Sequence, residues 1–309
     1  MADIPHIILN NNKSIPSVGM GCWMGGPGGG DRVYDMCMAA FKAGYRHFDT
    51  AAGYANEEYV GKAIRDSGIP RSEIYLTTKL RGDNNVQESL EASIKSLGVE
   101  YIDLYLIHWP QARIDGKALS PEESPTFVET WAEMEKLLET GRVKSIGVSN
   151  FSIKTLDVLL PHCVIMPATN QVEMHPCLPQ NELKTYCESK GIPLTAYSPL
   201  GRSTIFLEHP TILGLAEKNT CTAAQIVISW AVQRGTIPIP KSENAERMKA
   251  NITLVKLSPE DFAAVDELHK QPGMHKSLLV FDNTKDGKVF GWTYEQLGWN
   301  IQVGGQVTA

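Results

Sequence analysis

Four residues able to donate, accept or stabilise a proton follow short apolar segments of the sequence: Asp49, Tyr54, Lys79 and His108. A free phenol has a pKa of about 10 and is a weak acid near neutrality. A neighbouring ammonium lowers that pKa, and a carboxylate beside the ammonium keeps the lysine charged where burial would remove its proton. Asp49, Lys79 and Tyr54 could therefore form a tuned tyrosine general acid. His108 could donate an imidazole hydrogen bond to the same substrate oxygen.

Each of these residues also has a structural interpretation. Asp49 and Lys79 alone would be read as a buried ion pair. Tyr54 alone would be an aromatic residue of a loop, and His108 a hydrogen-bonded histidine at the end of a strand. The occurrence of all four after consecutive apolar segments favours catalysis.

Short apolar or β-branched segments alternate with segments of helical period along the chain, which indicates a repeating strand-helix unit. We expect eight strands, at 18–22, 46–50, 74–80, 102–108, 143–148, 167–173, 193–198 and 236–240. Their nearly continuous apolar character is typical of parallel strands buried on both faces. No break in composition divides the chain, so the sequence predicts one α/β domain over 1–309, a closed (β/α)8 TIM barrel.

Three additions to the barrel are expected. Segments 7–9 and 14–16 flank an Asn-rich turn at 10–12 and predict an N-terminal β-hairpin. An extra C-terminal helix is expected over 258–268, with Ser258 as its N-cap and Pro259 at its first position. The last forty residues predict an aromatic C-terminal loop that carries Phe281, Phe290, Trp292 and Trp299.

Reacting groups of such barrels lie at the C-terminal ends of the strands. The later strands also end in polar residues, namely Ser149, Asn150, Asn170, Gln171, Glu173, Tyr197, Ser198, Lys241 and Ser242. The expected rim of the barrel is therefore polar throughout and able to bind a ligand.

The sequence resembles the aldo-keto reductase family across nearly its whole length. The resemblance rests on seven motifs in order and spacing: GYRHFDTA at 44–51, TTK at 77–79, DLYLIHWP at 103–110, GVSNF at 147–151, NQVE at 170–173, YSPLG at 197–201 and IPKS at 239–242. It implies a barrel that binds NADP(H) in an extended form and reduces aldehydes or ketones without a metal. Under this resemblance Tyr54 is the general acid, Lys79 and Asp49 tune its pKa, and His108 orients the carbonyl.

A nicotinamide coenzyme would have to be bound by the barrel itself. Gly19-x-Gly21 lacks the third glycine of a Rossmann fingerprint, and the glycine run at 25–30 is expected to be a mobile first loop. Phosphate often binds after strands seven and eight of a barrel, where Lys241, Ser242 and Arg247 suit the 2′-phosphate of NADP. A solvated helix with two surface cations is the alternative.

The remaining coenzyme contacts follow from the polar strand ends and from the resemblance. Ser149, Asn150 and Gln171 could hold the nicotinamide carboxamide, which needs both a donor and an acceptor. Tyr197 could stack on the nicotinamide ring. The resemblance places Asn251 at the adenine and adds Ser198 and Leu200 to the expected contacts.

Three departures from the family pattern bear on the coenzyme. The segment at 201–210 is short where other members fold a long loop over the coenzyme, and Ala250 replaces a glutamate that contacts adenine. Glu243 brings a carboxylate near the expected 2′-phosphate, where it would repel phosphate or accept a ribose hydroxyl. We expect NADP(H) as the coenzyme, with NAD(H) as a weaker or dual one.

The substrate is expected to be a small carbonyl compound. Trp23 and Trp109, together with Phe281, Trp292 and Trp299, would line an apolar pocket, although each could instead be a core residue. A non-catalytic nicotinamide-binding, redox-sensing subunit is the alternative function. A metal-dependent barrel hydrolase is disfavoured because no His-x-His ligand pair follows the first strand, and no metal site is expected.

Composition narrows the classes of partner and compartment. Lys and Arg number 29 and Asp and Glu number 35, which gives a net charge of −6 and no basic block for nucleic acid. Neither a signal peptide nor an apolar segment of membrane-spanning length is found, so a cytoplasmic protein is expected. The six scattered cysteines predict reduced thiols, mostly in the core. A monomer is expected, with a dimer as the alternative.

Overall fold

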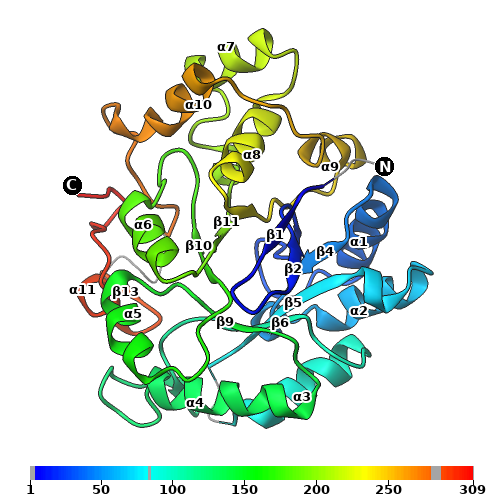
Figure 1. The fold of residues 1–309 in the computed structure, drawn as a ribbon, viewed down its shortest axis with the longest axis vertical. Coiled ribbons are helices and arrows are strands. Elements are labelled where there is room, and N and C mark those ends of the chain that lie inside the picture. Colours follow the sequence, from blue (N-terminus) through cyan, green and yellow to red (C-terminus); the bar gives the residue numbers. More distant parts are fainter. Residues whose placement is uncertain (1–3, 83–84, 280–286, 309) are drawn as a thin grey trace.

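The computed structural model describes residues 4–82, 85–279 and 287–308. Its central feature is an eight-stranded parallel sheet whose strands pair in the order of the chain. Helices surround this sheet (Figure 1). The strands are β3 (Met20–Gly21), β4 (His47–Asp49), β5 (Tyr75–Leu80), β6 (Leu104–Ile107), β9 (Ile146–Ser149), β10 (Asn170–Glu173), β11 (Leu194–Tyr197) and β12 (Ile237–Pro238). The predicted (β/α)8 barrel is confirmed.

Backbone hydrogen bonds between the first and last strand segments close the barrel. The amide of Gly19 donates to the carbonyl of Pro238 at 3.0 Å, and the amide of Gly21 donates to that of Pro240 at 3.0 Å. A Cβ atom on Gly21 would lie 2.9 Å from the carbonyl oxygen of Ile239, closer than real Cβ contacts allow. Glycine is therefore required for the two strands to approach at this seam.

The predicted N-terminal hairpin is confirmed. Strands β1 (His6–Ile8) and β2 (Ser14–Pro16) pair antiparallel, with Ile7 opposite Ile15. Buried Leu9 and Ile15 pack in one cluster with Leu106 and Ile237, which belong to barrel strands. The hairpin crosses the barrel in the view of Figure 1 and closes its N-terminal end. The end of the barrel that the hairpin leaves open is therefore the C-terminal one, where the polar strand ends lie.

Most helices of the barrel bury an apolar face toward the sheet, whereas α7 and α10 pack against α8. In α4 the buried residues include Phe127, Trp131 and Met134, and a capping box between Thr126 and Glu129 begins the helix. The helices are α1 (Asp31–Ala43), α2 (Glu57–Asp66), α3 (Val86–Leu97), α4 (Phe127–Leu137), α5 (Ile153–Leu159), α6 (Asn181–Ser189), α7 (Pro210–Lys218), α8 (Ala223–Gln233), α9 (Ala245–Asn251), α10 (Pro259–Asp266) and α11 (Tyr294–Leu297).

The C-terminal part departs from the expected loop. Helix α10 is the predicted extra helix, and the Ser258 side chain accepts from the amide of Asp261 as its N-cap. The aromatic segment, however, contains the antiparallel strands β13 (Lys288–Val289) and β14 (Trp292–Thr293), followed by α11. Thr293 and Gln296 form a capping box at the start of α11, which explains a short helix in a segment expected to be irregular.

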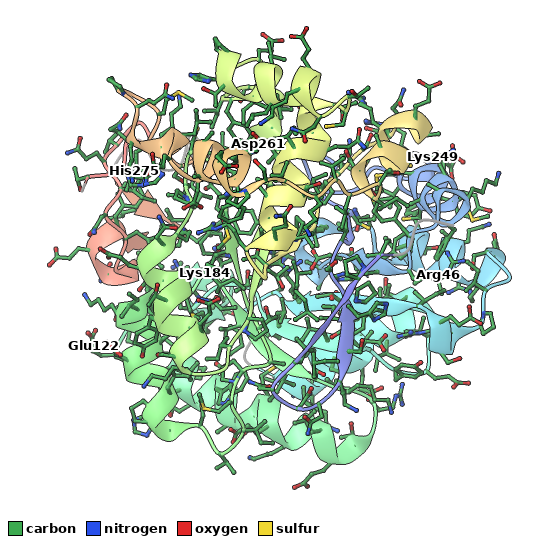
Figure 2. The ribbon with its side chains drawn as sticks, turned by 45° about the horizontal axis from the view of Figure 1, so that its top comes forward. Arg46, Glu122, Lys184, Lys249, Asp261 and His275 are labelled. Atoms are coloured by element: carbon green, nitrogen blue, oxygen red, sulfur yellow. The ribbon has the colours of Figure 1, made fainter. Side chains whose placement is uncertain are left out.

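Charged side chains gather on the outside of the molecule, as Glu122 and Lys249 illustrate in Figure 2. All six cysteines are free in the structure, and four of them are buried. No described helix is both long enough and apolar enough to cross a membrane.

Substitution of Gly21 tests the closure of the barrel. Gly21→Ala should lower the free energy of unfolding by about 1–3 kcal/mol, because the new methyl group must push apart the first and last strands. Gly214→Ala is the matched control, since Gly214 lies inside α7 with open space around its Cβ position. The control should stabilise the protein by up to about 1 kcal/mol. Urea denaturation of both variants checks these signs, and equal effects would contradict the proposed role of the seam.

Candidate active site

The four predicted catalytic residues come from three neighbouring units of the barrel. Asp49 ends β4, Lys79 lies near the end of β5, and His108 directly follows β6. Tyr54 ends a 3-10 turn, Ala52–Tyr54, that follows β4. Because the strands are parallel and Asp49 pairs with Thr77, two residues before Lys79, these side chains meet at the C-terminal end of the barrel.

Asp49 and Lys79 form a buried ion pair. The Lys79 Nζ lies 2.5 Å from Asp49 Oδ1, and the two side chains are 0% and 2% exposed. The ammonium also donates to the carbonyl oxygen of Thr50 at 2.8 Å. Burial alone would lower the pKa of Lys79, but the Asp49 carboxylate and the contact with Tyr54 outweigh it, and the pKa lies above its usual value. Lys79 is therefore a fixed positive charge.

Tyr54 lies within reach of that charge. The Lys79 Nζ donates to Tyr54 Oη at 3.5 Å. The sequence predicts that the ammonium lowers the pKa of the phenol, but the net shift of that pKa is in the opposite direction. Removal from water raises the pKa of Tyr54, and Lys79 only partly offsets this. The side chain is consequently a protonated phenol at neutral pH.

His108 faces Tyr54 edge to face, with ring centroids 5.6 Å apart and an interplanar angle of 72°. Burial lowers the pKa of His108 well below its usual value, and the positive charge of Lys79 lowers it further. The imidazole is therefore neutral at pH 7 and has one N–H available to donate. This supports the predicted role of His108 as a neutral hydrogen-bond donor.

A second group of predicted residues forms a hydrogen-bonded cluster beside the first. Gln171 Nε2 donates to Asp49 Oδ2 at 2.7 Å, and Ser149 Oγ donates to the Gln171 carbonyl at 2.8 Å. Asn150 Nδ2 donates to the His108 carbonyl at 2.9 Å, while Asn150 Oδ1 accepts from Tyr197 Oη at 2.9 Å. The sequence assigned Ser149, Asn150 and Gln171 only to the nicotinamide carboxamide, and Tyr197 only to stacking on the nicotinamide ring. The structure also makes them the support of Asp49 and His108.

The predicted phosphate site lies on the loop after β12. Lys241 and Arg247 are exposed, whereas Ser242 is buried and accepts from the amide of Asn244 at 3.1 Å. Glu243 contacts Lys241, Nζ to Oε1, at 2.5 Å. Arg32 of α1, which the sequence argument did not consider, also pairs with Glu243. The cations near this loop thus include Arg32, which is far from Lys241 and Arg247 in the sequence.

The other predicted coenzyme residues lie on α9 and after β11. Asn251 is 2% exposed, and among the described residues its Oδ1 atom is buried without a hydrogen-bond partner. Ser198 and Leu200 are partly exposed in the turn after β11. The glycine loop predicted to be mobile contacts the site, since the amide of Gly28 donates to the Tyr54 carbonyl at 2.7 Å.

Aromatic side chains surround Tyr54 and His108. Trp23 lies 4.9 Å from Tyr54 between ring centroids, and Trp109 contacts Phe290 at 5.0 Å and Trp299 at 5.7 Å. The expectation for Trp292 is wrong, because this side chain is 3% exposed, packs against Phe127 and donates to the Leu119 carbonyl. It is a core residue. Phe281 lies outside the described residues.

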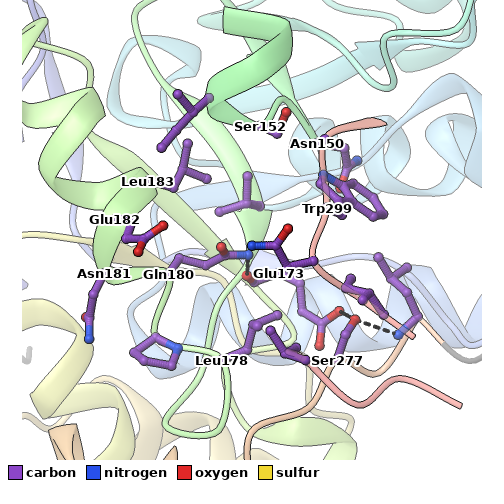
Figure 3. Close-up of a pocket in the computed structure, with 18 of the residues that line it drawn as sticks. Asn150, Ser152, Glu173, Leu178, Gln180, Asn181, Glu182, Leu183, Ser277 and Trp299 are labelled. Carbon is purple, nitrogen blue, oxygen red and sulfur yellow. Dashed lines mark hydrogen bonds between the residues drawn. The ribbon is translucent and has the colours of Figure 1, made fainter. Parts of the chain in front are cut away.

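A cavity of about 360 Å³ adjoins this cluster and is lined by Asn150, Tyr197 and Trp299. Glu173, at the end of β10, also lines it (Figure 3). Its carboxylate is 3% exposed and accepts from Ser277 Oγ at 2.7 Å and from the amide of Leu278 at 2.6 Å. The sequence identified Glu173 only as a polar strand end. The nearby His175 ring also contacts its carboxylate at 2.8 Å, but Ser277 and Leu278 are more than a hundred residues away, so the local sequence carried no signal of this anchor for the C-terminal segment.

Comparison with known proteins gives concordant matches. The sequence model described as "Aldo/keto reductase family" matches residues 17–270. Glycerol 2-dehydrogenase (NADP(+)) of Saccharomyces cerevisiae is 44% identical over 304 residues, which cover 91% of this chain and 96% of the yeast protein. An aldehyde reductase of the same yeast is 42% identical over 286 residues, covering 86% and 91%. The crystal structure of a Bombyx mori aldo-keto reductase in complex with NADP has a TM-score of 0.80 and 36% identity, covering 86% of this chain and 93% of that one.

Removal of the Lys79 ammonium tests the buried ion pair. Lys79→Met should lower the free energy of unfolding by about 3–5 kcal/mol at pH 7, because Asp49 loses its countercharge in the barrel. The loss should be smaller at pH 5, where the unpaired carboxyl takes up a proton. The double variant Lys79→Met, Asp49→Asn should be less destabilised than the single one.

The control for this measurement is Lys62→Met, which removes a surface lysine whose side chain is 54% exposed. Its effect should be below about 1 kcal/mol. Urea unfolding at pH 7 and pH 5 gives the free energy of unfolding of the wild type, of both single variants and of the double variant. Equal losses for Lys62→Met and Lys79→Met would contradict a buried pair.

Proposed function

The chain belongs to the aldo/keto reductase family, and we propose that it reduces the carbonyl group of an aldehyde or ketone to an alcohol with NADPH. Relatives of this chain carry the names glycerol 2-dehydrogenase (NADP(+)) and aldehyde reductase. The observation that carries the proposal is the chain of contacts from Asp49 through Lys79 to Tyr54, which holds a protonated phenol beside a permanent cation.

The residues around the site fit NADP(H). Lys241 and Arg247 offer cations for a 2′-phosphate. The unpaired buried Oδ1 of Asn251 is an acceptor suited to the exocyclic amine of adenine. Gln171 gives one amide N–H to Asp49, which leaves its side-chain oxygen and its second N–H for a carboxamide, and Ser149 and Asn150 would complete that contact. Tyr197 would stack on the nicotinamide, and Ser198 and Leu200 would contact the coenzyme between its nicotinamide and its adenine.

Bound NADPH supplies a hydride to the carbonyl carbon. Tyr54 donates its phenolic proton to the carbonyl oxygen, on which negative charge develops. Lys79 then stabilises the phenolate left on Tyr54, and Asp49 keeps Lys79 charged in its buried position. A neutral His108 donates a hydrogen bond to the same oxygen and orients the carbonyl.

Aromatic side chains define the class of substrate. Trp23 contacts the Tyr54 ring and Trp109 lies beside the His108 ring, and Phe290 and Trp299 extend the wall on the Trp109 side. These flat apolar surfaces suit a carbonyl compound with an apolar or aromatic substituent. The side chains of Asp49, Tyr54, Lys79 and His108, here called the catalytic tetrad, are all present and contact one another, so no observation favours a non-catalytic redox-sensing subunit.

Loss of the phenolic proton tests the assignment of the acid. Tyr54→Phe should keep the fold and NADPH affinity but lose at least about a hundredfold in kcat for carbonyl reduction. Tyr34→Phe is the matched control, since the Tyr34 hydroxyl donates to Asp66 on the surface and its removal should leave kcat unchanged. NADPH oxidation with an aldehyde panel measures both variants. More than about a tenth of wild-type turnover in Tyr54→Phe would exclude Tyr54 as the acid.

The pH dependence should differ between the two directions. The pKa of Tyr54 is raised, so the phenol stays protonated through neutrality, and reduction should be level until the pH approaches that pKa. Alcohol oxidation needs the phenolate as base and should rise about tenfold per pH unit below the pKa. Lys79→Met should move this rise to higher pH, and Asp49→Asn should move it less. Single-turnover rates provide the test, and an unshifted profile in Lys79→Met would mean that Lys79 does not tune Tyr54.

A further inference from the structure

A cluster of three charged residues lies at the rim of the barrel outside the catalytic tetrad. Arg32 Nε donates to Glu243 Oε2 at 3.0 Å, and Arg32 Nη2 donates to Glu243 Oε1 at 2.9 Å. Lys241 Nζ lies 2.5 Å from the same Oε1. We call Arg32, Lys241 and Glu243 the rim triad. Its guanidinium is bidentate, which is the strongest geometry for an arginine-carboxylate contact.

The rim triad joins the two ends of the barrel sequence. Arg32 is the second residue of α1, directly after the glycine loop, whereas Lys241 and Glu243 follow the last strand. These segments meet above the seam where the amide of Gly21 donates to the Pro240 carbonyl. Helices α1 and α9 lie side by side at this edge of the molecule (Figure 1), and Tyr45 Oη donates to the Met248 carbonyl between them. The triad therefore lies on the loop to which a coenzyme phosphate is assigned.

Arg32 changes the charge balance of this loop. The sequence alone predicts that two cations, Lys241 and Arg247, attract a 2′-phosphate while the carboxylate of Glu243 repels it. The structure adds a third cation and occupies both oxygens of Glu243. An occupied carboxylate is a poor acceptor for the 2′-hydroxyl of NAD(H), and its repulsion of a 2′-phosphate is offset by the adjacent guanidinium.

We propose that Arg32 determines coenzyme selectivity by holding Glu243, and so favours NADP(H) over NAD(H). This inference rests on the proposed function, because it assigns the 2′-phosphate to Lys241 and Arg247. Arg32 is a positioning residue that acts through Glu243. With Arg32 removed, Glu243 keeps only its contact with Lys241 within the rim triad, and its carboxylate is free to repel the phosphate and to accept a ribose hydroxyl.

The triad can be altered without unfolding the protein. The side chains of Arg32 and Glu243 are 65% and 35% exposed, and an exposed ion pair contributes little to stability. Glu243 lies in the loop between β12 and α9, and Arg32 is in the first turn of α1. Substitutions at both positions should therefore change local charge and leave the barrel intact.

Two nucleotide fragments of the coenzyme that differ in the 2′-phosphate separate the contribution of that phosphate to binding from that of the rest of the nucleotide. Binding of adenosine 2′,5′-bisphosphate and of adenosine 5′-monophosphate is measured by titration calorimetry at one ionic strength. Arg32→Ala should weaken the bisphosphate about fivefold and the monophosphate less than about twofold. Arg142→Ala is the matched control, because it removes an arginine from an ion pair with Glu91 on another part of the surface. It should change neither affinity by more than about twofold.

The double variant tests whether Arg32 acts through Glu243. Glu243→Gln should strengthen bisphosphate binding, and Arg32→Ala should then have less than about a twofold effect in the Glu243→Gln background. A full fivefold loss in that background would overturn the inference, because Arg32 would then contact the phosphate itself. Equal losses of both nucleotides in Arg32→Ala, or no loss of either, would also overturn it.

The same titrations distinguish this inference from the proposed function. Failure of the wild-type protein to bind either nucleotide would overturn the proposed coenzyme and the role of Arg32 together. Selective binding of the bisphosphate by the wild type, with no change in Arg32→Ala, would overturn the role of Arg32 alone. In Arg32→Ala, fluorescence titration should show that the dissociation constant of NADPH rises relative to that of NADH, as the bisphosphate constant rises relative to that of the monophosphate.

Discussion

A fully buried ammonium is the constraint on which the rest of the site depends. Lys79 has no exposed surface, so its charge must be compensated by groups on adjacent strands. Asp49 provides the countercharge and the Thr50 carbonyl provides a second acceptor. Both belong to the end of β4 and the residue after it, so the register between β4 and β5 decides whether the lysine is stable in its charged form. In that register Asp49 pairs with Thr77, two residues before Lys79.

Hydrogen bonds extend this constraint across the barrel mouth. Gln171 joins β10 to the Asp49 carboxylate on β4, on the far side of the sheet order. Asn150 links the backbone of His108 to the hydroxyl of Tyr197. The reacting groups and the groups assigned to the nicotinamide therefore belong to one network, and movement of either would disturb the other. Rigid strands position all of them, which suits a site that must align a donor and an acceptor of hydride.

The rim differs from the interior in its electrostatics. Charges in the barrel are held at fixed positions with little solvent, so the pKa values of Tyr54 and His108 depart from their usual values mainly because of burial. Charges of the rim triad are exposed and screened, so each contact is weak and exchangeable. The proposed chemistry is thus assigned to the buried residues inside the barrel, and the choice between coenzymes to the exposed rim triad.

The sequence by itself determined the barrel, its hairpin and its extra helix, because the period of apolar residues and the caps are local features. It also predicted that Asp49, Tyr54, Lys79 and His108 lie together at one end of the barrel, since parallel strands bring their C-terminal ends together whatever the details of packing. Only the tertiary structure decided that Gln171 supports Asp49, that Arg32 holds Glu243 and that Trp292 is a core residue. It also decided that burial outweighs Lys79 at the Tyr54 phenol. These properties depend on contacts between residues far apart in the chain and on the loss of water around them, and neither is encoded in local spacing.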